Sequence, residues 1–210
     1  MTDLPATEPP SDRRARTRQA LVGAGLRLLA QRPIDAIAID EIVAEAGVGK
    51  GSFYNHFDDK AALAGAIAAA IRIETERAVA EANAGVEDPA RRVARALCVY
   101  LGRAVADPRQ ATVMSRTPIW TEAASQLNRG VLGDVSAGLL QGRFQIPTAE
   151  AGVLLVLGVA HVALARILEE PSAAVTLGQQ LCGLLLKGLG LPAAEAEAVS
   201  AQAAHEILAE

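Results

Sequence analysis

The segment Ile39–Phe57 reads IDEIVAEAGVGKGSFYNHF, and it constrains the fold more than any other part of the chain. Apolar side chains share one face over residues 40–46, which predicts a short helix. Gly47 follows where a helix commonly ends in a left-handed residue. A second short helix is predicted over residues 50–57. Two short helices joined by a tight turn that contains glycine have the geometry of a helix-turn-helix.

The second of these predicted helices has distinct inner and outer faces. Phe53 and Phe57 stand four positions apart, so they share one face and should pack inward, while Val48 anchors the turn in the core. The outward set is polar or basic: Lys50, Ser52, Tyr54, Asn55 and His56. Lysine and tyrosine can reach phosphates, whereas serine and asparagine can bond to base edges. Gly51 removes a side chain where a sugar–phosphate backbone could approach closely.

The net charge of the chain is negative, so a nucleic-acid contact would have to use a local cluster of positive charges. The formal net charge is −4, with eight Lys and Arg against nine Asp and Glu in residues 1–60. Four arginines nevertheless lie in one six-residue window, Arg13, Arg14, Arg16 and Arg18. Taken alone, this cluster is equally typical of a solvated helix start and of a phosphate-binding strip.

The rest of the chain predicts an all-α protein. Alanine and leucine dominate, aromatic residues make up 3%, and β-branched residues form no alternating runs. Residues 1–11 read as a disordered head, and a helix runs from there to Arg32. Asp58 and Asp59 should cap a long helix that continues to about residue 84. Prolines and glycines then separate further helices at about 90–106, 110–116, 119–141, 148–169, 172–189 and 193–208.

The run from Arg18 to Leu63 resembles the DNA-binding domain of the TetR family of bacterial repressors. The resemblance is carried by D-E-I-V-A-E-A-G-V-x-K-G-S-F-Y-N-H-F-x-x-K and the amphipathic helix before it, about a fifth of the chain. It implies a three-helix DNA-binding domain at 12–60 and a helical ligand-binding and dimerisation domain at 61–210. It also implies a repressor that binds a palindromic operator on double-stranded DNA and is released by a small-molecule effector.

Matching positions carry the family's contacts onto this chain. Lys50, Tyr54 and His56 resemble phosphate-contacting positions, Ser52 and Asn55 base-reading positions, and Lys60 a clamp at the start of the fourth helix. The expected DNA-binding set is Arg14, Arg16, Arg18, Lys50, Gly51, Ser52, Tyr54, Asn55, His56 and Lys60. The chain departs from the family at two helix starts, where Ala38 and Gly49 replace the usual hydroxyl residues. Losing such a cap typically costs about 0.5–2 kcal/mol, and only a few tenths where glycine stands there.

Two late segments favour a homodimer. Val153–Leu168 is apolar nearly all round, and Leu181–Leu191 is rich in leucine, so each predicts a helix covered on every side. A second subunit packing against the helices near 148–169 and 172–189 would cover them. The alternative is a fully internal core helix.

The effector pocket is harder to locate. Polar or large residues amid apolar surroundings are the candidates: Cys98, Tyr100, Met114, Arg116, Trp120, Phe144 and His161. For each of them, ordinary core packing is the competing interpretation. The low aromatic content favours a small or aliphatic effector over a large planar one.

Other classes find little support. The sequence has no nucleophile elbow, phosphate-binding glycine loop or metal-spaced ligand set, so we expect no enzyme activity, no metal and no cofactor. Cys98 and Cys182 read as buried thiols in a reducing cytoplasm. The apolar run Val153–Ala165 contains His161 and is short for a bilayer, so we expect no membrane segment. The alternatives left open are an activator, or a helix-turn-helix dimer that binds a partner protein and has weak DNA affinity.

Overall fold

The computed structural model describes residues 10–116 and 128–209 of the chain. Throughout these residues the regular structure is helical, without strands, as the sequence predicts. Residues 1–9 of the predicted head lie outside the described residues. Helix α1 begins at Pro10, so it includes the last two residues of that predicted head. The chain separates into two compact units that divide between Ala68 and Ala69.

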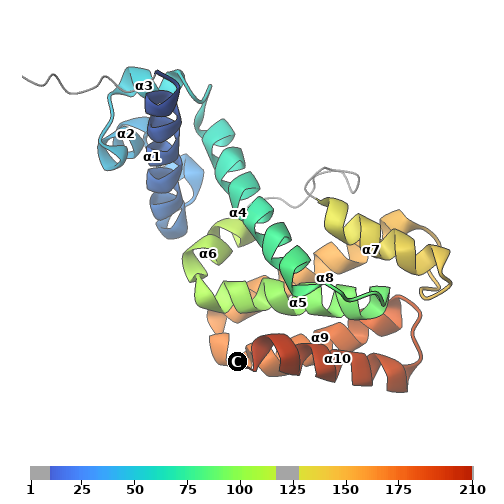
Figure 1. Cartoon of the computed structure of the whole chain (residues 1–210). Helices are drawn as coiled ribbons and strands as arrows, with labels where there is room; N and C mark the ends of the chain where they lie inside the picture. The colour runs from blue at the N-terminus through green and yellow to red at the C-terminus, as the bar shows by residue number, and fades with distance from the viewer. Residues whose placement is uncertain (1–9, 117–127, 210) are drawn as a thin grey trace, which may run out of the picture. The chain divides into compact units, whose positions relative to one another are not determined.

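The first unit packs three helices and the start of a fourth (Figure 1). Its elements are α1 (Pro10–Gln31), the 3₁₀ turn η1 (Ile34–Ala36), α2 (Ile39–Ala46), α3 (Lys50–Tyr54) and the first part of α4 (Lys60–Ala82). Leu21, Ile42 and Phe53 are fully buried at its centre. Gly25 brings α1 close to α4, since a Cβ there would lie 2.7 Å from Cδ1 of Ile67.

The second unit is a bundle in which α5, α8, α9 and α10 lie against one another (Figure 1). Its elements after α4 are α5 (Pro89–Ala106), α6 (Pro108–Arg116), α7 (Arg129–Leu140), α8 (Ala149–Glu169), η3 (Pro171–Ala173), α9 (Ala174–Gly188) and α10 (Ala193–Leu208). Leu101, Leu164, Ile167, Leu185 and Leu186 form its centre, each no more than 2% exposed. Small residues set the helix spacing, because a Cβ on Gly178 would lie 2.7 Å from Leu208.

Two predicted helices have ends that differ from the structure by three residues or so. The helix expected over 50–57 ends at Tyr54, because the N–H groups of His56 and Phe57 both donate to the carbonyl of Phe53 and close the chain into a turn. The helix expected over 172–189 begins as the 3₁₀ turn at Pro171 and becomes α9 at Ala174. Of the helix expected over 119–141, the part up to residue 127 lies outside the described residues.

The two cysteines lie where the sequence places them. Cys98 on α5 and Cys182 on α9 are both free and fully buried, with sulfur atoms 3.7 Å apart. The hydrogen bond to Cys98 and burial raise the pKa of the Cys182 thiol. Both sulfur atoms are shielded from solvent in the core, as expected of structural thiols.

Helix α8 carries large apolar side chains on its outward face. It is 21 residues long and strongly apolar, and only a third of its apolar window is buried, so by length and composition alone it could cross a membrane. The short run Val153–Ala165 predicts no membrane segment, but the helix that contains it is longer than that run. Helix length therefore does not exclude a membrane span. The core helix of a soluble protein gives the same profile. Leu154 and Val162 are 54% and 70% exposed, so the chain covers only one side of this helix.

Candidate nucleic-acid interface

The inner side of the helix-turn-helix is built as predicted. Gly47 ends α2 with φ of 67°, and the N–H of Val48 donates to the carbonyl of Val43 at 3.0 Å, which closes the turn. Phe53 and Phe57 are 0% and 5% exposed, and their ring centroids lie 5.9 Å apart. Burial of these rings against α1 fixes which side of α3 faces outward.

The outer side of α3 carries the predicted polar set. Lys50, Gly51, Tyr54 and Asn55 are exposed, whereas Ser52 and His56 are half-buried. His56 lies one residue beyond the C-cap Asn55, so the turn after the helix presents it.

Lys50 is engaged within the protein. Its Nζ lies 2.8 Å from an Asp40 carboxylate oxygen on α2, and both side chains are exposed. The hydrogen bond and the charge of Asp40 raise the pKa of Lys50. A phosphate that binds Lys50 must therefore compete with Asp40, which weakens the contact without abolishing it.

The structure brings part of the arginine cluster to the outer face of α3. A groove of about 510 Å³ is lined by Arg13, Arg14 and Thr17 from α1 and by Ser52, Asn55 and His56 from the α3 segment. The partial burial of His56 and the positive charges of Arg14 and Arg18 lower its pKa, which favours the uncharged ring. The groove is therefore a cationic, hydrogen-bonding channel beside the recognition surface.

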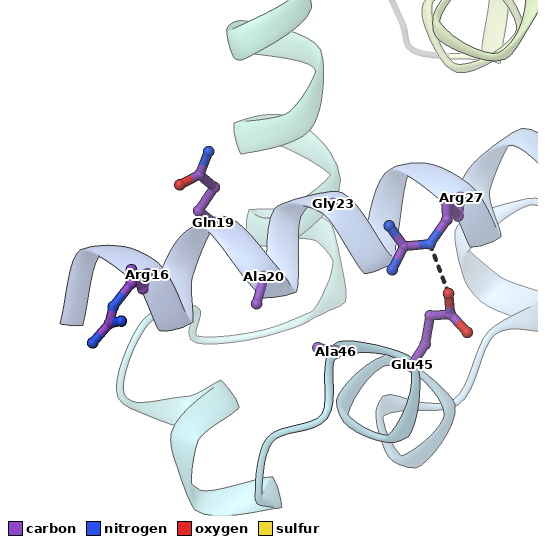
Figure 2. A pocket seen from close by; sticks show the side chains of 7 residues that line it. All are labelled: Arg16, Gln19, Ala20, Gly23, Arg27, Glu45 and Ala46. Atoms are coloured by element: carbon purple, nitrogen blue, oxygen red, sulfur yellow. Dashed lines mark hydrogen bonds and ion pairs between the residues drawn. The ribbon is translucent and has the colours of Figure 1, made fainter. Parts of the chain in front are cut away.

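The other two predicted arginines point elsewhere. The guanidinium of Arg18 lies 5.3 Å from the ring centroid of Phe57, a cation–π contact that braces α1 against the α3 segment. Arg16 lines a separate hollow between α1 and α2 (Figure 2). The arginine cluster thus divides between two surfaces of the first unit.

Both helix starts lack a side-chain cap, as expected from Ala38 and Gly49. The sequence reasoning missed a partial replacement at α2. The Glu41 carboxylate accepts from the N–H of Ala38 at 3.0 Å and from Arg32 at 2.5 Å. The hydrogen bond from Ala38 and then that from Arg32 lower the pKa of Glu41. A glutamate three residues after a helix start is the signal that could have predicted this bond.

Lys60 opens α4 and is half-buried. Its Nζ donates to the carbonyl of Ile37 at 2.8 Å and to that of Asp35 at 3.3 Å. Asp59 caps the same helix as predicted, by accepting from the N–H of Ala62 at 2.7 Å. Lys60 thus ties the start of α4 to the loop before α2.

Four of the predicted pocket residues belong to or pack against the buried core of the second unit. Cys98 and Phe144 are buried in its core, Tyr100 and Met114 are partly buried against that core, and Arg116 is exposed. Trp120 lies outside the described residues.

His161 on α8 is half-buried, and its Nδ1 atom is buried without a hydrogen-bond partner in the described part of the chain. A ligand or a protein group absent from this single chain would satisfy this atom.

A polar interior that sequence reasoning did not find lies between α4, α5 and α7. Arg72 donates to the fully buried Asn128, and Arg92 lies 2.5 Å from Asp134. Burial raises the pKa of Asp134 and of Glu76, and it raises the pKa of Tyr100 to about 12. No spacing rule links these residues, because they lie on three helices far apart in sequence.

Within the described residues, no group of three or more His, Cys, Asp or Glu side chains is arranged to hold a metal ion.

Comparison with known proteins agrees with the geometry of the first unit. Residues 21–67 match the family model described as bacterial regulatory proteins, tetR family. The transcriptional regulator AcuR of Cereibacter sphaeroides is 39% identical over 70 residues, 29% of this chain and 32% of that protein. The HTH-type transcriptional repressor DhaR of a Mycobacterium species is 43% identical over 54 residues, 26% of this chain and 27% of that protein. The matches therefore span a third or less of these relatives.

Solved structures match over most of the chain. The structure of RolR in complex with resorcinol has a TM-score of 0.69 at 25% identity and covers 91% of this chain and 96% of that one. A tetR family transcription regulator from Shewanella sp. PV-4 has a TM-score of 0.73 at 16% identity, over 84% of this chain and 99% of that one, and shows the fold alone. The helix-turn-helix geometry and the family model agree, so residues 21–67 are similar to the DNA-binding region of the tetR family of bacterial regulatory proteins, and the fold of the chain is similar to that of the solved regulators.

Proposed function

We propose that the chain is a transcriptional repressor that binds a palindromic operator as a homodimer and is released by a small-molecule effector. The observation that carries this proposal is the cationic groove between α1 and the α3 segment. It places Arg13 and Arg14 beside Ser52 and Asn55, so phosphate-binding and base-reading groups line one channel. Such a protein acts in the cytoplasm on double-stranded DNA.

We assign residues 12–60 to DNA binding and residues 61–210 to effector binding and dimerisation. The relative DhaR, which is 43% identical over 54 residues, is named a repressor. RolR, whose fold follows nearly the whole chain, binds resorcinol. A small effector with hydrogen-bonding groups also suits the polar interior around Tyr100 and Asn128.

Dimerisation through α8 and α9 would cover apolar surface that the single chain leaves in water. On α8, Leu154 and Val162 are 54% and 70% exposed, and on α9 Leu184 is 63% exposed. A four-helix interface between two copies would bury these side chains. Two copies also supply the two recognition helices that successive major grooves need, about 34–36 Å apart.

The test begins with selection of bound DNA from a random pool, which should return a palindrome. Binding of the selected duplex should weaken steeply with salt, because each phosphate contact releases counterions. Tyr54→Phe should cost about 0.5–1.5 kcal/mol through a lost hydrogen bond. Binding that is independent of both salt and sequence would overturn the repressor assignment.

The Lys50–Asp40 ion pair supplies a matched pair of variants. Lys50→Ala should weaken DNA binding, whereas Asp40→Asn should strengthen it by up to about fivefold per protomer, the equivalent of an exposed ion pair of about 1 kcal/mol. The proposal requires that DNA affinity falls in Lys50→Ala and rises in Asp40→Asn. If the ion pair were purely structural, both variants would be less stable and neither would bind DNA more tightly.

The alternative function is an activator, or a dimer that binds a partner protein and has weak DNA affinity. The engaged Lys50 and the uncapped helix starts at Ala38 and Gly49 favour modest affinity. A reporter gene placed behind the selected palindrome separates these roles. Repression that a small molecule relieves supports the proposal, and stimulated transcription supports the activator.

A further inference from the structure

The polar interior between α4, α5 and α7 holds two side chains whose polar atoms lack a partner. Glu76 on α4 and Tyr100 on α5 are both half-buried, and within the described residues neither makes a hydrogen bond. Polar groups that are partly withdrawn from water normally bond to another group of the protein. The carboxylate and the phenol are therefore candidate contacts for a bound molecule.

The register of α4 against α5 places these two side chains at the same level. Near one end of the pair, Arg103 of α5 lies 3.6 Å from Glu74 of α4. Nearer the other end, Arg95 of α5 donates to the backbone carbonyl of Ala82 of α4 at 2.6 Å. The two helices are therefore antiparallel, and interpolation between these contacts sets the glutamate and the tyrosine opposite each other.

Helix α7 approaches the same level. Arg72, one turn before Glu76 on α4, donates to the fully buried Asn128 just before α7. A Cβ on Gly130 would overlap the Glu76 carboxylate, so glycine makes room for it between the two helices. Burial raises the pKa of Glu76 and of Tyr100, and the charge of Arg72 opposes that rise at both groups, so Arg72 lies near both.

The charges of this interior balance in number. Arg72 and Glu76 lie one turn apart on α4, and Arg92 on α5 lies 2.5 Å from Asp134 on α7. Two guanidinium groups are thus matched by two carboxylates. A charged guest would add one charge without a counter-charge to a poorly solvated site, so a neutral molecule is favoured. A hydroxyl group suits the unpartnered pair, because it can donate to a carboxylate and accept from a phenol.

We propose that Glu76 and Tyr100 bind a small neutral effector through its hydroxyl groups, Glu76 by accepting a hydrogen bond and Tyr100 by donating one. This inference rests on the proposed function and names the chemical class of its effector. Arg72 keeps its bond to Asn128, and its charge favours the ionised Glu76 that accepts from a hydroxyl.

The first measurement is thermal melting without any added molecule, followed by circular dichroism. Groups that the folded protein leaves without a partner contribute little to its stability, so Glu76→Gln and Tyr100→Phe should melt within about 2 °C of the wild type or above it. Asp134→Asn, which breaks the ion pair with Arg92, should melt clearly lower. If Glu76→Gln and Tyr100→Phe melt as low as Asp134→Asn, the two groups hold the fold together and the inference is wrong.

The second measurement is binding of small probes by calorimetry. Two neutral diols, resorcinol and cyclohexanediol, are compared with an anion, hydroxybenzoate, and a cation, aminocyclohexanol. At least one diol should bind the wild type more tightly than either charged probe, and Glu76→Gln and Tyr100→Phe should each weaken it about three- to tenfold through one lost hydrogen bond. Glu81→Gln and Tyr54→Phe make the same changes at exposed positions and should leave binding unchanged. If neither diol binds, or a charged probe binds more tightly, the inference is wrong.

DNA binding separates this inference from the proposed function. Without a probe, Glu76→Gln and Tyr100→Phe should bind the selected palindrome like the wild type, because both residues lie outside the DNA-binding unit. If a charged probe releases the wild type from the palindrome and the diols do not, the effector class is wrong and the proposed function stands. If the wild type binds no duplex DNA, the proposed function fails, whereas melting and probe binding still decide whether the two groups form a site.

Discussion

The two units of this chain are built by different means. The first unit holds two of the three phenylalanines, Phe53 and Phe57, and closes a small core around them. The second unit relies on alanine, glycine and leucine, which let helices approach closely, and on ion pairs between distant segments. The helix-turn-helix of the first unit is specified largely by side chains within a few residues of one another. The second unit is specified by contacts that no short window contains.

The largest expected effect tests the aromatic core of the first unit. Phe53→Ala removes a fully buried ring and should destabilise this unit by about 3–5 kcal/mol. So small a unit should then be largely unfolded, and DNA binding should be lost. Amide hydrogen exchange, followed separately for peptides before and after Ala68, measures the effect. Tyr54→Phe serves as control, because it keeps the ring that lies 5.4 Å from Phe53. If peptides of both units lose protection from exchange equally, the two units do not have separate cores.

The second unit should instead be sensitive to added volume. A Cβ at Gly138 would lie 2.1 Å from the ring of Phe144, which is buried and has little room to move. Gly138→Ala should therefore cost about 1–3 kcal/mol. Gly133→Ala on the same helix α7 is the control, since a Cβ there meets nothing within 4 Å. It should stabilise by roughly 0.5–1 kcal/mol through helix propensity. If both variants melt at the same temperature, close helix approach does not define this unit.

A third prediction concerns the ion pairs of the second unit. Arg143 bonds to both oxygens of Asp88, at 2.8 and 3.1 Å, and lies 2.7 Å from Glu195 at the start of α10. Because the arginine side chain is 25% exposed, Arg143→Gln should cost about 1–2 kcal/mol, more than a surface pair. Arg166→Gln, whose partners lie in the same segment and whose side chain is 46% exposed, should cost less than about 0.5 kcal/mol.

The same network fixes the sign of an acid effect. The bond from Arg143 lowers the pKa of Asp88 below its ordinary value. The ionised Asp88 therefore stabilises the fold at pH values above the unfolded-state pKa of an aspartate, about 3.9. This stabilisation is lost as the pH falls through the lower pKa of Asp88 in the folded protein. Acid unfolding of Arg143→Gln should show a weaker pH dependence below about pH 4 than that of the wild type. If Arg143→Gln and the wild type show the same pH dependence of unfolding below about pH 4, the Asp88–Arg143 pair does not contribute to acid stability.

These differences explain what the sequence could predict. The inner face of α3 and the cap at Asp59 follow from spacings of a few residues, and both are confirmed. The stacking of Arg18 on Phe57 and the bonds of Lys60 to the loop before α2 were missed, because they join residues 23 to 39 positions apart. In the second unit, the helices were predictable from proline and glycine punctuation. Their partners were not, since alanine and leucine pack against any similar face.

The smallest expected effect returns to the DNA-binding groove and depends on His56. Its pKa is lowered by partial burial and by Arg14 and Arg18, so protonation is unfavourable in the free protein. A phosphate in the groove would neutralise that repulsion and raise the pKa again. DNA affinity should therefore increase roughly two- to threefold as the pH falls from about 8 to about 6, across the ordinary histidine pKa of about 6.5.

The folding stability of the free first unit should change with pH in the direction opposite to its DNA affinity. A histidine whose folded pKa is depressed disfavours its protonated form, so the free first unit should lose a little stability as the pH falls below about 6.5. His56→Gln keeps a neutral hydrogen-bonding side chain and should abolish both trends. Thermal melting and DNA binding, each measured at both pH values and fixed salt, separate them. If affinity and stability change in the same direction with pH, His56 does not meet phosphate in the groove, and phosphate binding there depends on Arg13 and Arg14.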